Sequence, residues 1–203
     1  MSNWIPHPSL LGGQTVELRP LERTHFSALK KLAADPRIWE HYTFDGTQEA
    51  AFNQTLEEAL VFRSKGLEYP FVILHKKEEC IIGSTRFMNI DAPNRNLEIG
   101  FTWLHPDYWS SVVNIECKLL LLNYCFEQLK TIRVQLKTDS NNIRSKKAIE
   151  KIGGKFEGLV RNHIIRENGT VRTSALYSIL MEEWNDVKKS LKQMYFDKSG
   201  SRY

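Results

Sequence analysis

The sequence has 203 residues, of which 41% are hydrophobic and 26% are charged, and its formal net charge is +4. These values are typical of one globular domain over residues 1–203, with a sizeable core that we place at about 10–190. Lysine and arginine are scattered among acidic residues, which disfavours a general nucleic-acid-binding protein.

The first residues lack the basic and apolar regions of a signal peptide, and no window reaches the roughly 20 apolar residues of a membrane span. We therefore expect a cytoplasmic protein without a membrane partner. The three cysteines, Cys80, Cys117 and Cys125, fit no metal spacing and no even disulfide framework. Cys117 and Cys125 fall in an apolar helical stretch, so we expect buried thiols and no metal site.

The first half of the chain predicts a strand, two helices and three more strands. Alternating apolar and polar residues predict the strand over 16–21. Apolar residues at helical spacing predict helices over 22–35 and 48–66. The three strands that follow cover residues 69–77, 81–90 and 96–104.

The strand over 96–104 alternates throughout its length, which predicts two distinct faces. One face is expected to carry the apolar residues Leu97, Ile99, Phe101 and Trp103, and the other Glu98, Gly100 and Thr102.

The second half predicts a helix over 113–129 that is apolar around most of its circumference and hence well buried. Asn142 can cap a short helix, and Asn168–Gly169 is a strong hairpin turn signal. The other elements are expected over residues 132–138, 144–152, 155–166, 171–181 and 182–195, with a frayed tail over 196–203. This order predicts an α/β domain with a mixed, mostly antiparallel central sheet flanked by helices.

Five motifs occur in this order along the chain: LRPL, EIGFTWLHPDYW, RVQLKTDSNNIRSKKAIEKIG, EGLVRNHIIRENGTVR and YSILMEEWNDVK. Together they resemble the GNAT N-acetyltransferase superfamily, and most closely its group of ribosomal-protein N-terminal acetyltransferases. The resemblance covers residues 10–190. It implies the GNAT fold with a V-shaped coenzyme cleft between central strands. It also implies transfer of an acetyl group from acetyl-coenzyme A to a primary amine, by direct attack in a ternary complex.

A strand ending at Leu104, a turn and a buried helix leave free N–H groups at the helix start, where an anion is favoured. The resemblance places the coenzyme pyrophosphate there. However, Val112 stands where the superfamily loop has its first glycine, and Asn114 where it has a small residue. Either the site is degraded, or the loop is a subgroup variant in which valine keeps a negative φ; the pattern VNxE followed by Cys117 and Lys118 favours the variant.

The residues implied to contact the coenzyme are Trp103, Leu104, Trp109, Ser110, Ser111, Val112, Val113, Asn114, Asn142, Ser145 and Lys147. A basic cluster of Arg133, Lys137, Arg144, Lys146 and Lys147 either meets the coenzyme 3′-phosphate or forms a solvated face.

Two residues are candidates for acid–base chemistry. Glu98 corresponds to a carboxylate that the family often uses as a base; the alternative is a salt-bridged or edge glutamate. The family's frequent tyrosine acid is replaced by Ile149. The pattern Asn142-x-x-Ser145 resembles that of the ribosomal-protein group, in which the serine contacts the coenzyme sulfur; the alternative is an ordinary residue beside a helix cap.

The aromatic segment IWEHYTF fits the loop that closes over the acceptor in this fold. Its candidate acceptor contacts are Trp39, His41, Tyr42 and Phe44, to which the hairpin adds His163 and Tyr177; core positions are the alternative for each.

Three functions therefore remain open from the sequence: an acetyl-coenzyme A-dependent N-acetyltransferase, a catalytically silent GNAT-fold binding protein, and a ribosome or RNA binder. The acceptor is a protein N-terminus or a small-molecule amine, and the chain is a monomer or a homodimer.

Overall fold

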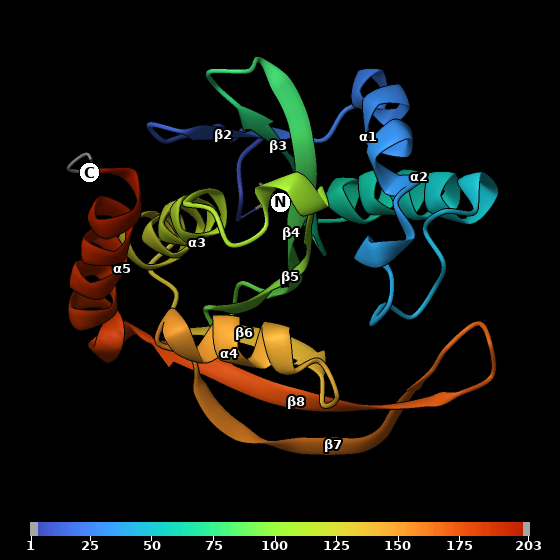
Figure 1. Cartoon of the computed structure of the whole chain (residues 1–203). Helices are drawn as coiled ribbons and strands as arrows, with labels where there is room; N and C mark the ends of the chain where they lie inside the picture. The colour runs from blue at the N-terminus through green and yellow to red at the C-terminus, as the bar shows by residue number, and fades with distance from the viewer. Residues whose placement is uncertain (1–3, 201–203) are drawn as a thin grey trace.

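The computed structural model describes residues 4–200 and contains one eight-stranded sheet (Figure 1). The spatial order of the strands is β1-β2-β3-β4-β5-β6-β8-β7, and every neighbouring pair is antiparallel except β5 and β6. The strands are β1 (Leu11–Gly12), β2 (Val16–Pro20), β3 (Tyr69–His75), β4 (Cys80–Asp91), β5 (Asn96–Leu104), β6 (Arg133–Asp139), β7 (Lys155–Ile165) and β8 (Val171–Leu180). The predicted mixed, mostly antiparallel α/β sheet is confirmed.

Five α-helices flank this sheet: α1 (Phe26–Ala33), α2 (Glu49–Ser64), α3 (Val113–Asn123), α4 (Ile143–Lys151) and α5 (Trp184–Ser199). Helices α1 and α2 lie on one side of β4 and β5, and α3 and α5 lie on the other (Figure 1). Each side has its own core, because a sheet residue can face only one side. None of the helices in the described part of the chain is long and apolar enough to cross a membrane.

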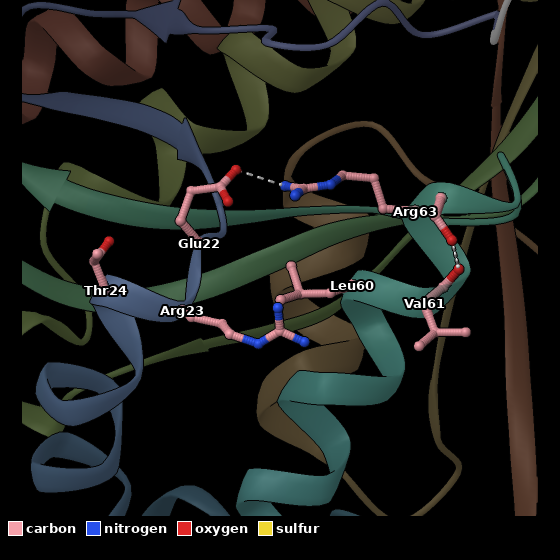
Figure 2. A pocket seen from close by; sticks show the side chains of 7 residues that line it. Glu22, Arg23, Thr24, Leu60, Val61 and Arg63 are labelled. Carbon is pink, nitrogen blue, oxygen red and sulfur yellow. Dashed lines mark hydrogen bonds and ion pairs between the residues drawn. The ribbon is translucent and has the colours of Figure 1, made fainter.

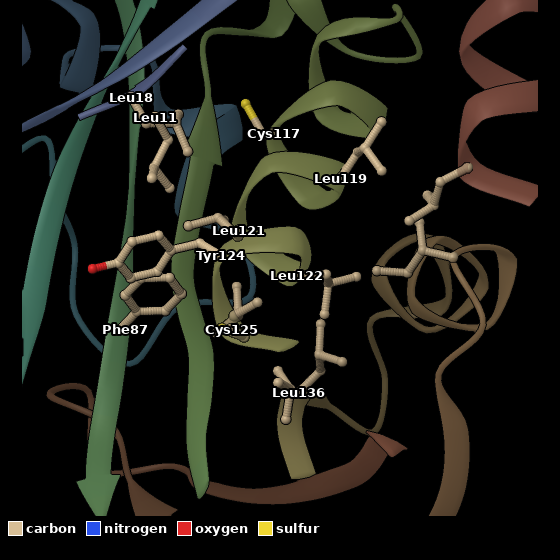
Figure 3. Packing of buried hydrophobic residues seen from close by; sticks show 14 of the residues in the cluster. Leu11, Leu18, Phe87, Cys117, Leu119, Leu121, Leu122, Tyr124, Cys125 and Leu136 are labelled. Atoms are coloured by element: carbon tan, nitrogen blue, oxygen red, sulfur yellow. The ribbon is translucent and has the colours of Figure 1, made fainter. Parts of the chain in front are cut away.

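Helix α3 is apolar around most of its circumference and is buried accordingly. Cys117, Leu121, Leu122 and Cys125 are fully buried, and Figure 3 shows these side chains packed against residues of the sheet. The predicted burial of both cysteines is confirmed, and burial raises the pKa of the Cys117 thiol to about 12. A π-helical segment, Tyr124–Gln128, continues α3, a change of helix type that apolar spacing does not predict.

The predicted regular alternation of β5 is wrong. A bulge interrupts its pairing with β4, and Phe101 adopts a left-handed φ of 51°. Leu97 and Ile99 therefore belong to the core on the α3 side, whereas Phe101 and Trp103 pack in the core on the α1–α2 side. Beyond the bulge the two faces are exchanged, because one extra residue reverses the direction of every later side chain.

Strands β5 and β6 pair over only three positions, from Asn96–Arg133 to Glu98–Gln135. Both strands continue beyond that point, β5 to Leu104 and β6 to Asp139, without further pairing to each other. The sheet therefore divides just after Glu98, and one edge of β5 is left without a strand neighbour.

The cap of α4, the hairpin turn, the first strand and the end of the last helix can also be compared with the predicted elements. The Asn142 cap and the hairpin turn are confirmed: Asn142 Oδ1 accepts from Ser145 N at 2.9 Å, and Gly169 has a φ of 77°. Strand β1 was not predicted, because two residues are too few for a periodic signal. The expected frayed tail is wrong for residues 196–199, which continue α5 to a left-handed Gly200; residues 201–203 lie outside the described chain.

Candidate active site

The segment before α3 presents several unused backbone donors. Among the described residues, no hydrogen bond uses the backbone N–H of Ser110, Val112, Asn114 or Ile115. The N–H of Val113 is bonded to Ser111 Oγ at 3.2 Å. A helix N-terminus with free N–H groups favours an anion, through both the donors and the helix dipole.

The glycine-free loop reaches this conformation with ordinary side chains. Val112 has φ −69° and ψ −21°, so the expected negative φ is confirmed and this position needs no glycine. Ser110 takes the left-handed conformation instead, with φ 59°, and its carbonyl accepts a hydrogen bond from Lys198 Nζ on α5. The left-handed residue thus lies two positions before the expected glycine.

Glu116 anchors the first turn of α3 from within. Its buried carboxylate accepts hydrogen bonds from the backbone N–H groups of Gln14, Thr15 and Val16 at 2.7–2.8 Å. A Cβ added at Gly13 would lie 2.5 Å from this carboxylate, which explains the glycine there. This contact ties the start of α3 to the turn before β2 and holds the free N–H groups in place.

The start of α4 lies against the loop that precedes α3. The Arg144 guanidinium stacks over the Trp109 ring at 3.8 Å, and Trp109 Nε1 donates to the Leu104 carbonyl at 2.9 Å. This stack bridges the two halves of the divided sheet. Ser145 is half-buried beside it, and its hydroxyl makes no hydrogen bond within the described chain.

The side chains of Trp103 and Leu104 are both buried, in the two opposite cores. Only their backbone could therefore contact a coenzyme. Between them and the bulge, Thr102 projects toward α3, where its hydroxyl accepts from Lys118 Nζ at 2.9 Å and lies 2.7 Å from the Thr85 hydroxyl.

Lys118 is a buried ammonium group without a carboxylate partner among the described residues, and it was not predicted as a site residue. Burial lowers the pKa of its side chain to about 8. A lysine inside an otherwise apolar helical stretch was the available signal, but spacing alone does not tell whether such a side chain reaches solvent.

Glu98 is 3% exposed and lies where β5 and β6 stop pairing. Its Oε2 accepts from Asn89 Nδ2 and Gln135 Nε2 at 3.0 Å, and from Lys137 Nζ at 3.2 Å. Its Oε1 has no hydrogen-bond partner within the described chain. The glutamate is thus salt-bridged, as one interpretation of the sequence expected, yet it keeps one oxygen for a further donor.

Comparison with known proteins assigns this arrangement to a family, because the acetyltransferase (GNAT) domain matches residues 15–155. The chain belongs to the GNAT acetyltransferase family. Its relatives include the uncharacterized N-acetyltransferase YnaD of Bacillus subtilis, which is 25% identical over 169 residues that cover 83% of this chain and 95% of the relative.

Solved structures show the same GNAT fold. A GCN5-related N-acetyltransferase from Brucella melitensis superposes with a TM-score of 0.86 at 24% identity, over 97% of this chain and 91% of its own. RimJ of Mycobacterium smegmatis, solved in complex with CoA-disulfide, superposes with a TM-score of 0.79 at 19% identity, over 96% and 97% of the two chains.

The predicted acceptor contacts in the aromatic loop before α2 differ in their surroundings. Trp39 is buried in the core of the α1–α2 side, and its Nε1 donates to the Ala33 carbonyl at 2.8 Å. It therefore anchors the loop to the core. Tyr42 donates to the Thr102 carbonyl at 2.9 Å, and Phe44 stacks on Phe101. His41 is half-buried and makes no hydrogen bond or ion pair with another residue between 4 and 200.

Tyr177 does not lie on the face of the sheet that carries Glu98. It is fully buried beneath α4, and its hydroxyl donates to Glu150 at 3.1 Å, which argues against contact with an acceptor. His163, by contrast, lies on the Glu98 side, with Nδ1 2.9 Å from the Ser174 hydroxyl. Burial lowers the pKa of His163, and the charges of Lys137 and Arg172 act in the same direction.

The predicted basic cluster is largely engaged in contacts within the chain. Arg133 is bonded to Glu157, Lys137 to Glu98, Arg144 to Trp109 and Lys146 to the Ser140 carbonyl. Lys147 is exposed in the middle of α4 and makes no hydrogen bond or ion pair with another described residue.

A surface cavity lies elsewhere, between the start of α1 and the end of α2 (Figure 2). Its lining is Glu22, Arg23, Thr24, Leu60, Val61, Arg63 and Ser64. The Arg63–Glu22 ion pair, 3.1 Å long, lies across it. No predicted site residue lines this cavity, so we assign the chemistry to the divided sheet and not to this surface.

Proposed function

We propose that this GNAT protein transfers the acetyl group of acetyl-coenzyme A to a primary amine. The observation that carries the proposal is the set of four backbone N–H groups, in the loop before α3 and its first turn, that have no acceptor among the described residues. This loop contacts α4 through the Trp109–Arg144 stack. This set has the chemistry of a pyrophosphate site. The exposed ammonium of Lys147 supplies a further charge for a phosphate.

Glu98 is the proposed base. Its free Oε1 can accept a proton from the acceptor ammonium, directly or through one water molecule, and Lys137 and the two amides hold the carboxylate in place. The coenzyme supplies the acetyl group as an activated thioester. The neutral amine then forms the N–C bond as the C–S bond breaks. The second proton that the nitrogen loses ends on the coenzyme sulfur, and Glu98 releases the first one to solvent.

Ser145 is the proposed donor to that sulfur. Its hydroxyl is uncommitted, while its backbone N–H is fixed by the Asn142 cap. A hydrogen bond that strengthens as negative charge develops on sulfur favours the transition state over the ground state. Ser145 thereby stabilises the leaving group while Glu98 handles the proton of the acceptor.

The alternative function is a silent GNAT-fold binding protein, and coenzyme binding with a screen of amines separates the two. Calorimetry should detect binding of coenzyme A, and thiol release should accompany transfer to at least one amine class, including peptide N-termini and small amines. Binding without thiol release from any amine would support the silent fold. No binding at millimolar coenzyme would make the start of α3 an ordinary helix cap.

A further inference from the structure

One face of the divided sheet gathers polar side chains from three strands. Residues that pair directly across neighbouring strands project to the same face, and the pairs Glu98–Gln135 and Asp139–Ser174 carry this face from β5 through β6 to β8. Its residues are Glu98 on β5, Gln135, Lys137 and Asp139 on β6, and Arg172, Ser174, Leu176 and Ser178 on β8, of which only Leu176 is apolar.

Arg172 has no partner on this face. Within the described chain its guanidinium forms neither a hydrogen bond nor an ion pair, and its Nε is buried without an acceptor. Burial lowers the pKa of Arg172, while nearby Asp139 and Glu98 oppose that shift without coming within ion-pair distance. A buried donor without an acceptor is costly, so this group has the properties of a ligand contact.

The charges on this face do not balance. Glu98 is paired with Lys137, and Asp139 is paired with Arg166. His163 carries little charge at neutral pH, because its pKa lies below the usual value. Among the described residues of this face, Arg172 therefore adds one positive charge without an ion-pair partner, on the face that carries the proposed base.

The aromatic loop contacts the tip of the hairpin that carries Arg172. Burial raises the pKa of Tyr42 in this loop, and the charges of Arg86 and Arg172 act in the opposite direction. The hairpin tip contacts the loop through a hydrogen bond from Glu167 N to the Thr43 carbonyl at 3.1 Å. The hairpin that carries Arg172 is thus tied to the loop that carries Tyr42, while Arg172 shares the sheet face of Glu98.

We infer that Arg172 binds a carboxylate of the acceptor, so the acceptor is an amine that also carries a carboxylate. This inference rests on the proposed function and names the substrate class for the same site. Arginine binds a carboxylate through two parallel N–H···O bonds, and such pairing would satisfy the unpaired guanidinium. A polycationic acceptor, such as a polyamine or an aminoglycoside, would instead meet an uncompensated positive charge.

Matched acceptors test this inference. Glutamate and glutamine, alanine and alaninamide, and peptides beginning Ser-Glu or Ser-Gln differ mainly in one carboxylate, and the peptide pair separates a protein terminus from a free amino acid. The carboxylate member of the preferred pair should have roughly 10- to 100-fold higher kcat/KM, chiefly through KM. Arg172→Gln should remove this preference, whereas Arg161→Gln, at an exposed position on β7, should retain it.

Binding of the N-acetylated products supplies a readout that does not depend on turnover. Calorimetry with the coenzyme A complex should show tighter binding of the carboxylate product than of its amide, and Arg172→Gln should abolish the difference while coenzyme affinity stays unchanged. Equal use and equal binding of both members by the wild type would overturn the inference. A failure of acetyl transfer with every amine, accompanied by carboxylate-selective binding, would reject the proposed chemistry and retain the role of Arg172.

Discussion

At the scale of single residues, Glu98 has a structural role in its hydrogen bonds, and we propose a chemical role for it as well. Three donors converge on its Oε2, which fixes the carboxylate, while Oε1 remains available. A glutamine at this position could keep part of the hydrogen bonding but could not accept a proton from an ammonium group. Because one oxygen is held by hydrogen bonds and the other is available, a substitution can test Glu98 as a base.

Glu98→Gln should lower turnover at pH 7 by roughly 100-fold, a typical contribution of general base catalysis. Turnover should recover in part above pH 9, because the acceptor amine then deprotonates without help. The measurement is a pH–rate profile, with Glu182→Gln at an exposed position as the control. An unchanged rate at pH 7 would leave Glu98 as a salt-bridge residue only.

At the scale of elements, α3 and the loop before it form one unit. Glu116 fixes the first turn from the side of β2, and Lys198 bonds the Ser110 carbonyl from α5. The free N–H groups are consequently held by contacts from both ends of the chain. This explains how a loop without glycine can present its backbone donors, since an anion site needs N–H groups that point toward the ligand and does not need a particular residue type.

Substitutions at Val112 test that unit. Val112→Gly should bind coenzyme A within a few fold of wild type, because the native φ of −69° suits both residues. Val112→Asp should weaken binding by roughly 100-fold or more, because its carboxylate would repel the phosphates. Calorimetry gives the affinities, and Val61→Asp on exposed α2 controls for the added charge. Equal affinity for Val112→Asp and wild type would remove the pyrophosphate from this loop.

At the scale of the whole molecule, the sheet has two halves that separate just beyond Glu98. Helix α3 packs inside the larger core and contributes a buried ammonium, that of Lys118, which donates to the Thr102 hydroxyl on β5. Below about pH 8 this group is charged in both the folded and the unfolded chain, so folding carries the cost of burying a charge. The free energy of unfolding should reflect that cost.

Between about pH 8 and 10.5 the unfolded chain keeps a proton that folded Lys118 has lost, so this group makes the free energy of unfolding rise with pH. The rise should be of the order of 3 kcal/mol. Denaturant unfolding of wild type and Lys118→Met across this range isolates it, because other titrating groups are common to both. Parallel curves for the two proteins would mean that Lys118 titrates like a solvated lysine.

The sequence by itself determined the elements and much of the site. Apolar periodicity located the helices and the longer strands, Asn142 and Asn168–Gly169 marked a cap and a turn, and the motifs indicated the GNAT fold. These signals are local: spacing, capping and turn chemistry act over a few neighbouring residues. The negative φ at Val112 is also a local property, because it depends on the conformation of a single residue.

The tertiary structure alone decided which side chains meet. The bulge at Phe101 exchanges the faces of β5, and the Glu98–Lys137 pair joins residues 39 positions apart in sequence. Tyr177 alternates correctly along its strand, yet it faces α4 and not the acceptor. The unpaired charge of Arg172 among the described residues likewise emerges only when β5, β6 and β8 pair to form one face. Such outcomes depend on register and burial, which arise from long-range packing and leave no periodic trace in the sequence.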